Sequence, residues 1–90
     1  MNKYLINVSY HLGINKQYSL FIFRMPSLNE TQLISNYTQL TIEKLLTILK
    51  EKSAIYKTNK ILLSGECSHL NELLKAEGYE PSYELNYEEL

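Results

Sequence analysis

The sequence is poor in the residues on which many catalytic and metal sites depend. It contains one cysteine, Cys67, one arginine, Arg24, no tryptophan and no aspartate, since all ten acidic residues are glutamate. A single cysteine cannot form an internal disulfide, which is typical of proteins from reducing compartments. The lack of aspartate, the commonest ligand in two-metal nuclease and polymerase sites, disfavours that class of enzyme.

Long apolar runs are also missing. No stretch approaches the roughly 20 apolar residues of a membrane span, and the first eight residues lack the uninterrupted apolar core of a signal peptide. We therefore expect a cytoplasmic protein that makes no contact with a membrane. The chain has 90 residues, 44% hydrophobic and 21% charged, which fits one globular domain over residues 1–90.

The formal net charge of −1 conceals two oppositely charged halves. Residues 1–60 carry eight Lys or Arg against three Glu, whereas residues 61–90 carry one Lys against seven Glu. This division fits complementary charges inside the fold, self-association, or two surfaces that face different partners.

Two strands joined by a tight turn are predicted for the first 26 residues. Residues 4–10 alternate apolar and polar side chains, which is the pattern of a strand with one buried face. After a turn at residues 13–16, residues 18–25 are apolar on both faces, and Pro26 ends the strand because it lacks a backbone N–H. The short connection predicts an antiparallel hairpin whose second strand is the more central.

Residues 27–40 have two interpretations. Ser27 followed by Glu30 fits a capping box with a helical stripe after it, but a loop with a short helical turn fits equally. The next segment is clearer. Thr41 can cap a helix that runs to about Ala54, in which residues 42, 45, 46 and 49 form an apolar stripe.

The segment Lys-Ile-Leu-Leu-Ser-Gly-Glu-Cys-Ser-His, residues 60–69, predicts a buried strand that breaks at a glycine. Ser68 can cap a short helix that Gly78 ends in a left-handed conformation. Pro81 then precedes alternating tyrosine or leucine and glutamate or asparagine over residues 83–87, which predicts a fourth strand. A strand, helix and strand in succession imply a parallel pair, unless Pro81 turns the last strand back antiparallel.

These elements predict an α+β fold, a two-layer α/β sandwich with a mixed four-stranded sheet. The element order is ββαβαβ, and both helices cover one face. The other face of the sheet is then free to bind a partner or to dimerise.

Cys67 and His69 lie in the predicted bend between strand and helix. A cysteine near a helix N-terminus can become a nucleophile, which would make the chain a small cysteine-dependent enzyme, and His11 could complete a three-ligand zinc site. The chain has no second cysteine for a thioredoxin-like site and no arginine after Cys67 for a phosphatase loop. The alternative, which we favour, is that Cys67 is a small buried hydrophobe and His69 an exposed helix residue. We predict no catalytic, cofactor or metal site.

Tyrosine is the most abundant aromatic residue, with eight copies. Tyrosine is enriched at binding surfaces because its ring is large and its hydroxyl can form a hydrogen bond. The last three tyrosines lie among glutamates, a combination that suits a basic groove on a partner protein, although a solvated edge strand is an equal alternative. The residues predicted to contact a partner are Tyr79, Tyr83, Glu84, Tyr87 and Glu88.

Nucleic-acid binding through the lysines of residues 44–60 and the tyrosines of the sheet is a weaker alternative. One arginine and a pI of about 6.1 leave little charge for phosphate contacts. We therefore predict a non-enzymatic protein-binding module without a cofactor, with dimerisation through the sheet as a second interaction. The Asn-, Ile-, Lys- and Tyr-rich composition is typical of small proteins from phages and plasmids. It favours the hypothesis of an anti-CRISPR-like inhibitor of a host defence nuclease.

Overall fold

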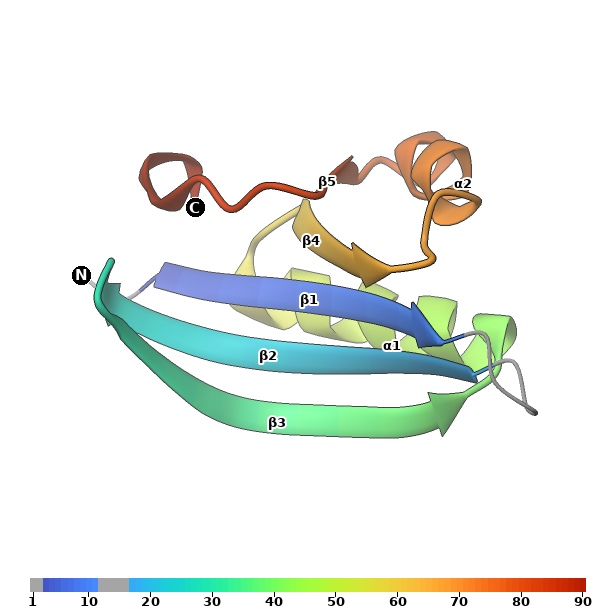
Figure 1. Cartoon of the computed structure of the whole chain (residues 1–90), viewed down its shortest axis with the longest axis horizontal. Coiled ribbons are helices and arrows are strands. Elements are labelled where there is room, and N and C mark those ends of the chain that lie inside the picture. The colour runs from blue at the N-terminus through green and yellow to red at the C-terminus, as the bar shows by residue number, and fades with distance from the viewer. Residues whose placement is uncertain (1–2, 12–16) are drawn as a thin grey trace.

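The alternating residues near the start of the chain form β1 (Lys3–His11), the central strand of a five-stranded sheet. The computed structural model describes residues 3–11 and 17–90. In Figure 1 the strands follow the order β3-β2-β1-β4-β5. The prediction of four strands, with the second more central than the first, is therefore wrong. β1 is central because it pairs with β2 on one side and β4 on the other.

The antiparallel hairpin is confirmed. β2 (Gln17–Ser27) pairs with β1 so that Ile6 lies opposite Ile22. The turn predicted at residues 13–16 lies outside the described residues. Pro26 does not end the strand but lies within β2, at a shift of register against the next strand. A proline is tolerated there because the register shift interrupts the regular ladder of backbone hydrogen bonds.

Residues 27–40, expected to be a helix or a loop, form the third strand of the sheet. In β3 (Glu30–Leu40), Glu30 pairs with Ser27 of β2, so Leu28 and Asn29 are the turn of a second hairpin rather than the start of a helix. The register shows two extra residues in β3, at Ile34 and near Gln39. These β-bulges interrupt the alternation of side chains, and so the period-two pattern of a strand is not visible in the sequence.

Both edges of the sheet have features that oppose pairing with another chain. The β3 edge carries no charge between Thr31 and Thr41, but its bulges twist the strand, and Gln39 has a positive φ of 56°. At the other edge, β5 (Glu80–Ser82) is only three residues long and contains Pro81. Bulges, short strands and prolines all make an edge a poor template for strand addition.

The main helix begins where the sequence predicts. In α1 (Ile42–Tyr56), the hydroxyl of Thr41 accepts a hydrogen bond from the backbone N–H of Lys44 at 3.2 Å. The helix extends two residues beyond the predicted end at Ala54. It ends at Lys57, whose φ of 53° is left-handed and whose backbone N–H bonds to the Ser53 carbonyl.

The buried strand of the segment 60–69 is β4 (Lys60–Gly65), which is parallel to β1. Gly65 has a φ of +76°, and a Cβ placed on it would lie 2.5 Å from the carbonyl oxygen of Tyr10, so only glycine fits this bend. The following helix, α2 (Leu70–Ala76), has His69 rather than Ser68 at its N-cap, and no side chain caps it. The predicted cap is wrong because the helix starts from a backbone turn in which the Leu70 N–H bonds to the Cys67 carbonyl.

The parallel pair formed by strand, helix and strand is confirmed, but the last strand is earlier than predicted. β5 pairs with β4 from Lys60 opposite Glu80 to Leu62 opposite Ser82. The predicted strand over residues 83–87 is wrong. The Ser82 hydroxyl accepts a hydrogen bond from the backbone N–H of Glu84 at 3.1 Å, a local turn that takes the chain away from the ladder.

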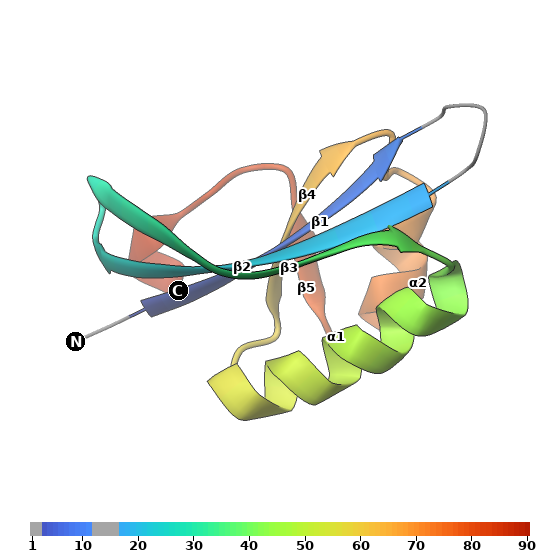
Figure 2. The ribbon, with the colours of Figure 1, turned by 90° about the horizontal axis from the view of Figure 1, so that it is seen from below.

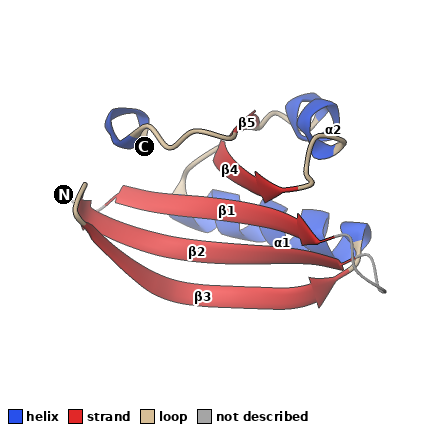
Figure 3. Cartoon of the chain, viewed as in Figure 1, coloured by secondary structure: helices blue, strands red, loops and turns tan. Residues whose placement is uncertain are grey.

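Both helices lie on one face of the sheet, as predicted (Figure 2). Leu45 and Leu49 of α1 and Leu70 and Leu74 of α2 are fully buried in one core with alternate residues of β1, β2 and β4. The fold is therefore α+β with two layers, in the order βββαβαβ followed by a short 3-10 helix, η1 (Tyr87–Glu89) (Figure 3). Within the described residues, neither helix is long and apolar enough to cross a membrane.

Candidate interaction surface

After β5 the chain crosses to the face of the sheet that the helices leave open. Figure 2 shows the loop between β5 and η1 on the side away from α1. We call residues 83–90 the C-terminal segment. It contributes to the burial of Leu5, which alternates with the core residue Ile6, points to the open face and is only 5% exposed. The C-terminal segment therefore acts as a partial cover over one end of the open face.

Two hydrogen bonds fix the far end of this segment. The Tyr87 hydroxyl donates to the Pro26 carbonyl at 3.2 Å, and the Lys3 ammonium donates to the Tyr87 carbonyl at 2.8 Å. The same ammonium lies 4.4 Å from the centre of the Tyr87 ring. Lys60 adds a weaker tie, 4.0 Å from a Glu89 carboxylate oxygen. The segment is thus held at Ser82 in β5 and again at Tyr87.

The five residues predicted to contact a partner do not form one surface. Tyr79 packs against the core, with its hydroxyl 3.2 Å from the Ser53 hydroxyl, and Tyr87 is half-buried against β2. Tyr83, Glu84 and Glu88 are exposed. A single alternating strand would have placed all three tyrosines on one side, but the chain turns at Ser82 and η1, so only Tyr83 remains outside.

Leu85 is the residue of this surface that the sequence reasoning missed. It is 42% exposed, and Tyr83 beside it is 52% exposed, although both side chains are largely apolar. The alternation places Leu85 with Tyr83 and Tyr87 in a predicted strand, but Leu85 is not among the residues predicted to contact a partner. The hydrogen bond between Ser82 and Glu84 that ends the ladder is the local reason that this residue stays at the surface.

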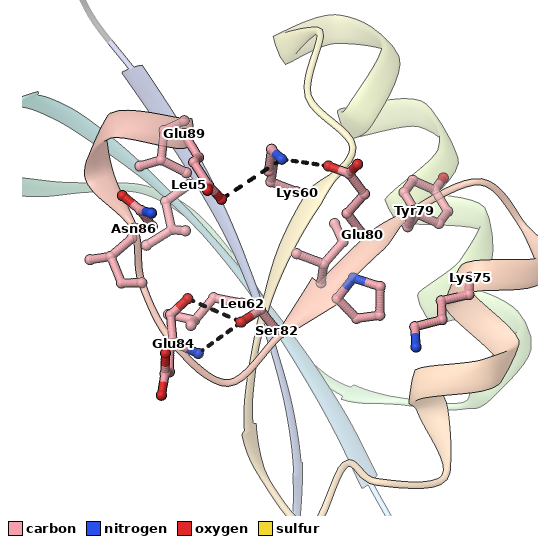
Figure 4. A pocket seen from close by; sticks show the side chains of 14 residues that line it. Leu5, Lys60, Leu62, Lys75, Tyr79, Glu80, Ser82, Glu84, Asn86 and Glu89 are labelled. Atoms are coloured by element: carbon pink, nitrogen blue, oxygen red, sulfur yellow. Dashed lines mark hydrogen bonds and ion pairs between the residues drawn. The ribbon is translucent and has the colours of Figure 1, made fainter.

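A hollow of about 490 Å³ lies between β4, β5 and the C-terminal segment. Its apolar walls include Leu5, Leu62 and Leu85. Figure 4 shows Lys60 at one end, between Glu80 and Glu89, and the turn of Ser82 and Glu84 at the other. We call it the C-terminal hollow. It exists because β5 covers only half of β4 before the chain leaves the sheet.

The part of the open face that the C-terminal segment leaves uncovered is apolar in its middle. Phe21 and Phe23 of β2 stack with ring centres 6.3 Å apart and are both half-buried. Phe23 lies opposite the covered Leu5 in the sheet, so the phenylalanine pair adjoins the C-terminal segment. Asn7, on the same face of β1, donates a hydrogen bond to the Leu62 carbonyl at 2.9 Å.

Cys67 lies in the core and not in an accessible site. Its side chain is fully buried, and its thiol donates to the Ser64 carbonyl at 2.9 Å. Burial raises the pKa of the Cys67 thiol above its ordinary value, so the thiolate is disfavoured at neutral pH. These properties fit the interpretation of Cys67 as a small hydrophobe and disfavour its use as a nucleophile.

His69 joins an aromatic cluster that the sequence reasoning did not identify. Its Nε2 lies 2.7 Å from the Tyr18 hydroxyl, and its ring meets Tyr10 edge-on at 4.8 Å. Burial, with smaller effects from Tyr10 and Cys67, raises the pKa of Tyr18, so the phenol stays protonated and can donate to His69. The pairing of Tyr10 with Tyr18 across the predicted hairpin is the sequence feature that indicates the tyrosine part of this cluster.

The proposed zinc ligands are not brought together. His11 alternates with Tyr10 along β1 and bonds to Ser9, 3.2 Å away, on the face opposite the core that holds Cys67. In the described ranges 3–11 and 17–90, no three His, Cys, Asp or Glu residues are close enough to hold a metal ion.

Two of the lysines of residues 44–60, which were considered for nucleic-acid binding, form ion pairs with glutamates. Lys60 lies 2.5 Å from Glu80, and a hydrogen bond to Glu80 raises the lysine pKa. Lys52 lies 3.6 Å from Glu51 and 5.7 Å from the centre of the Tyr37 ring, and its hydrogen bond to Tyr37 raises its pKa. The positive charge available for phosphate contacts is therefore reduced at Lys52 in α1 and at Lys60 in β4.

Comparisons with protein-family models, curated proteins and solved structures gave no match for this chain.

Proposed function

We propose that this chain is a non-enzymatic module that binds another protein through the C-terminal segment. The observation that carries the proposal is the exposure of Tyr83 and Leu85, 52% and 42%, on a segment that is fixed at both ends. Exposed apolar side chains that are held in place offer contact area at little cost in conformational entropy. Tyrosine is also among the residues that contribute most to binding at protein interfaces.

The charge around this pair supports a basic partner. Glu84 and Glu88 are exposed in the same segment, and neither forms an ion pair within the part of the chain that the structure describes. Complementary charge accelerates association and selects between partners more than it adds affinity. A groove that binds nucleic acid is a basic surface of this kind. An anti-CRISPR-like inhibitor that occupies such a groove on a host nuclease is the specific form of the proposal.

A non-enzymatic role is supported by the position of the most reactive side chain. Cys67 is buried and its pKa is raised, so catalysis by its thiolate would require the core to open. The Nε2 atom of His69 is already hydrogen-bonded to the Tyr18 hydroxyl.

Self-association through the open face is a second interaction, and we expect it to be weak. Phenylalanine buries at most about 150–250 Å² when it is fully covered, so the half-buried Phe21 and Phe23 supply a few hundred Å² at most. Stable interfaces bury about 800 Å² on each partner. We therefore expect a monomer at micromolar concentration, which sedimentation equilibrium would test.

The experiment that tests the proposal is affinity capture from the source cell with the wild-type chain and with Tyr83→Ser/Leu85→Ser. The captured protein is then purified and its binding reconstituted from two components. Binding that survives in the pure mixture and requires Tyr83 and Leu85 supports the proposal. Binding that the double substitution leaves unchanged would contradict it.

A further inference from the structure

The C-terminal hollow combines features that favour one kind of side chain. Its volume of about 490 Å³ falls within the range of roughly 300–1,000 Å³ that is usual for ligand sites. Leu5, Leu62 and Leu85 give it apolar walls, and glutamates lie at both of its ends (Figure 4). A fitting occupant is therefore apolar along its length and positively charged at its tip.

The charges that line the hollow are not equally available. Lys60 lies between Glu80, at 2.5 Å, and Glu89, at 4.0 Å, so its positive charge offsets one of the two carboxylates, and both carboxylates already have an ammonium neighbour. Lys75 also lines the hollow, and its ammonium is 3.9 Å from Glu72.

Glu84 is the acidic residue of the lining that has no ion pair among the described residues, and it is exposed at the rim. Its backbone is fixed at the rim, because its N–H donates to the Ser82 hydroxyl at 3.1 Å and the same hydroxyl donates to its carbonyl at 3.3 Å.

We propose that the C-terminal hollow receives an arginine side chain of the partner protein. The three methylenes of the arginine lie along Leu62 and Leu85, and the guanidinium forms paired hydrogen bonds with the Glu84 carboxylate. Arginine fits better than lysine because its guanidinium is planar, bidentate and less strongly hydrated. An apolar side chain would leave the Glu84 carboxylate without a partner, and an anion would be repelled by its negative charge. This inference rests on the proposed function, since the partner protein supplies the arginine.

A titration with a small probe tests the site without knowledge of the partner. N-acetyl-arginine methylamide is added to the ¹⁵N-labelled protein, and N-acetyl-citrulline methylamide, its neutral isostere, serves as the control. We expect saturable shifts of the backbone signals of Leu62, Glu84 and Leu85 with arginine, and binding at least about fivefold weaker with citrulline, as fits an exposed ion pair. Equal binding of the two probes or shifts elsewhere would overturn the proposal, as would tighter binding of N-acetyl-lysine methylamide, added as a third probe.

Variants of the same segment separate this site from the proposed function. Glu84→Gln should weaken arginine binding about fivefold, whereas Glu88→Gln, an exposed neighbour that does not line the hollow, should leave it unchanged. Tyr83 does not line the hollow either, so Tyr83→Ser should lower partner affinity without changing arginine binding. If arginine fails to bind while Tyr83→Ser still weakens the partner complex, only the arginine site is wrong. If arginine binds but substitution of Tyr83 and Leu85 leaves the affinity for the partner unchanged, the proposed function is wrong.

Discussion

The hydroxyl of Tyr87 donates a hydrogen bond to the carbonyl oxygen of Pro26 across 61 positions of sequence, at 3.2 Å. This bond ties η1 to the end of β2, and Lys3 ties it to the start of β1. The position of Tyr83 and Leu85 depends on it, because they lie between this anchor and the end of β5. The proposed interaction surface is therefore built by residues from both ends of the described chain.

Removal of this hydroxyl should loosen the C-terminal segment without unfolding the sheet. We expect Tyr87→Phe to cost about 0.5–1.5 kcal/mol, the usual net value of a hydrogen bond, and to speed amide exchange over residues 83–90. Tyr83→Phe is the matched control, because no hydrogen bond of the Tyr83 hydroxyl occurs among the described residues and its ring is 52% exposed. Equal exchange rates in the two variants would show that the bond does not hold the segment.

The two left-handed glycines should respond differently to an added methyl group. Gly65→Ala places a Cβ 2.5 Å from the Tyr10 carbonyl oxygen in addition to the strained φ of +76°, whereas the Cβ of Gly78→Ala, at a φ of +92°, meets open space. Left-handed strain alone costs about 1–2 kcal/mol. We expect Gly78→Ala to lose about this much stability and Gly65→Ala clearly more, measured by urea unfolding followed by circular dichroism. A larger loss for Gly78→Ala would contradict the bend described at Gly65.

The two candidate N-caps can be distinguished in the same way. Thr41→Ala removes the hydroxyl that accepts from the Lys44 N–H, and we expect a loss of about 1 kcal/mol of stability. Ser68→Ala should have almost no effect, because α2 has no side-chain cap. A comparable loss in both variants in urea unfolding would restore Ser68 as the cap of α2.

Alkaline pH should destabilise the fold through Cys67. Burial raises the pKa of this thiol in the folded state above its ordinary value of about 9, so the folded protein keeps the proton that the unfolded chain releases. The stability linked to Cys67 is complete below pH 9 and declines as pH rises from there toward the folded pKa, by up to about 1.4 kcal/mol per pH unit.

We expect Cys67→Ala to remove this decline between pH 9 and pH 10. Tyr18, whose pKa is also raised, begins to contribute only near pH 10. Urea unfolding of both proteins at several pH values measures how the free energy of unfolding changes with pH. The same slope in the wild type and in Cys67→Ala would show that burial does not raise the pKa of the Cys67 thiol.

The sequence predicted the elements whose patterns are local and undisturbed. Thr41 with the apolar stripe behind it predicted the start and buried face of α1, and Gly65 marked the end of β4. β3 was not recognised as a strand because two bulges interrupt its alternation, and Ser27 and Glu30, which face each other across a hairpin, have the same spacing as a capping box.

The candidate surface was predicted only in part, because its geometry depends on contacts that are distant in sequence. Tyr83, Glu84 and Glu88 are exposed as expected. The inward turn of Tyr87 is set by Pro26 and Lys3, which no local pattern near residue 87 reveals. The exposure of Leu85 likewise follows from the early end of β5.

The most direct test of the account is the affinity of the purified partner for Tyr83→Ser/Leu85→Ser, measured by isothermal titration calorimetry. The matched control is Ile55→Ser/Leu73→Ser, which removes two exposed apolar side chains, 56% and 37% exposed, from the helices. We predict a rise in Kd of at least about tenfold for the first variant, equivalent to about 1.4 kcal/mol, and less than about twofold for the control. Equal values of Kd for the wild type and Tyr83→Ser/Leu85→Ser would contradict the proposal that this segment binds the partner.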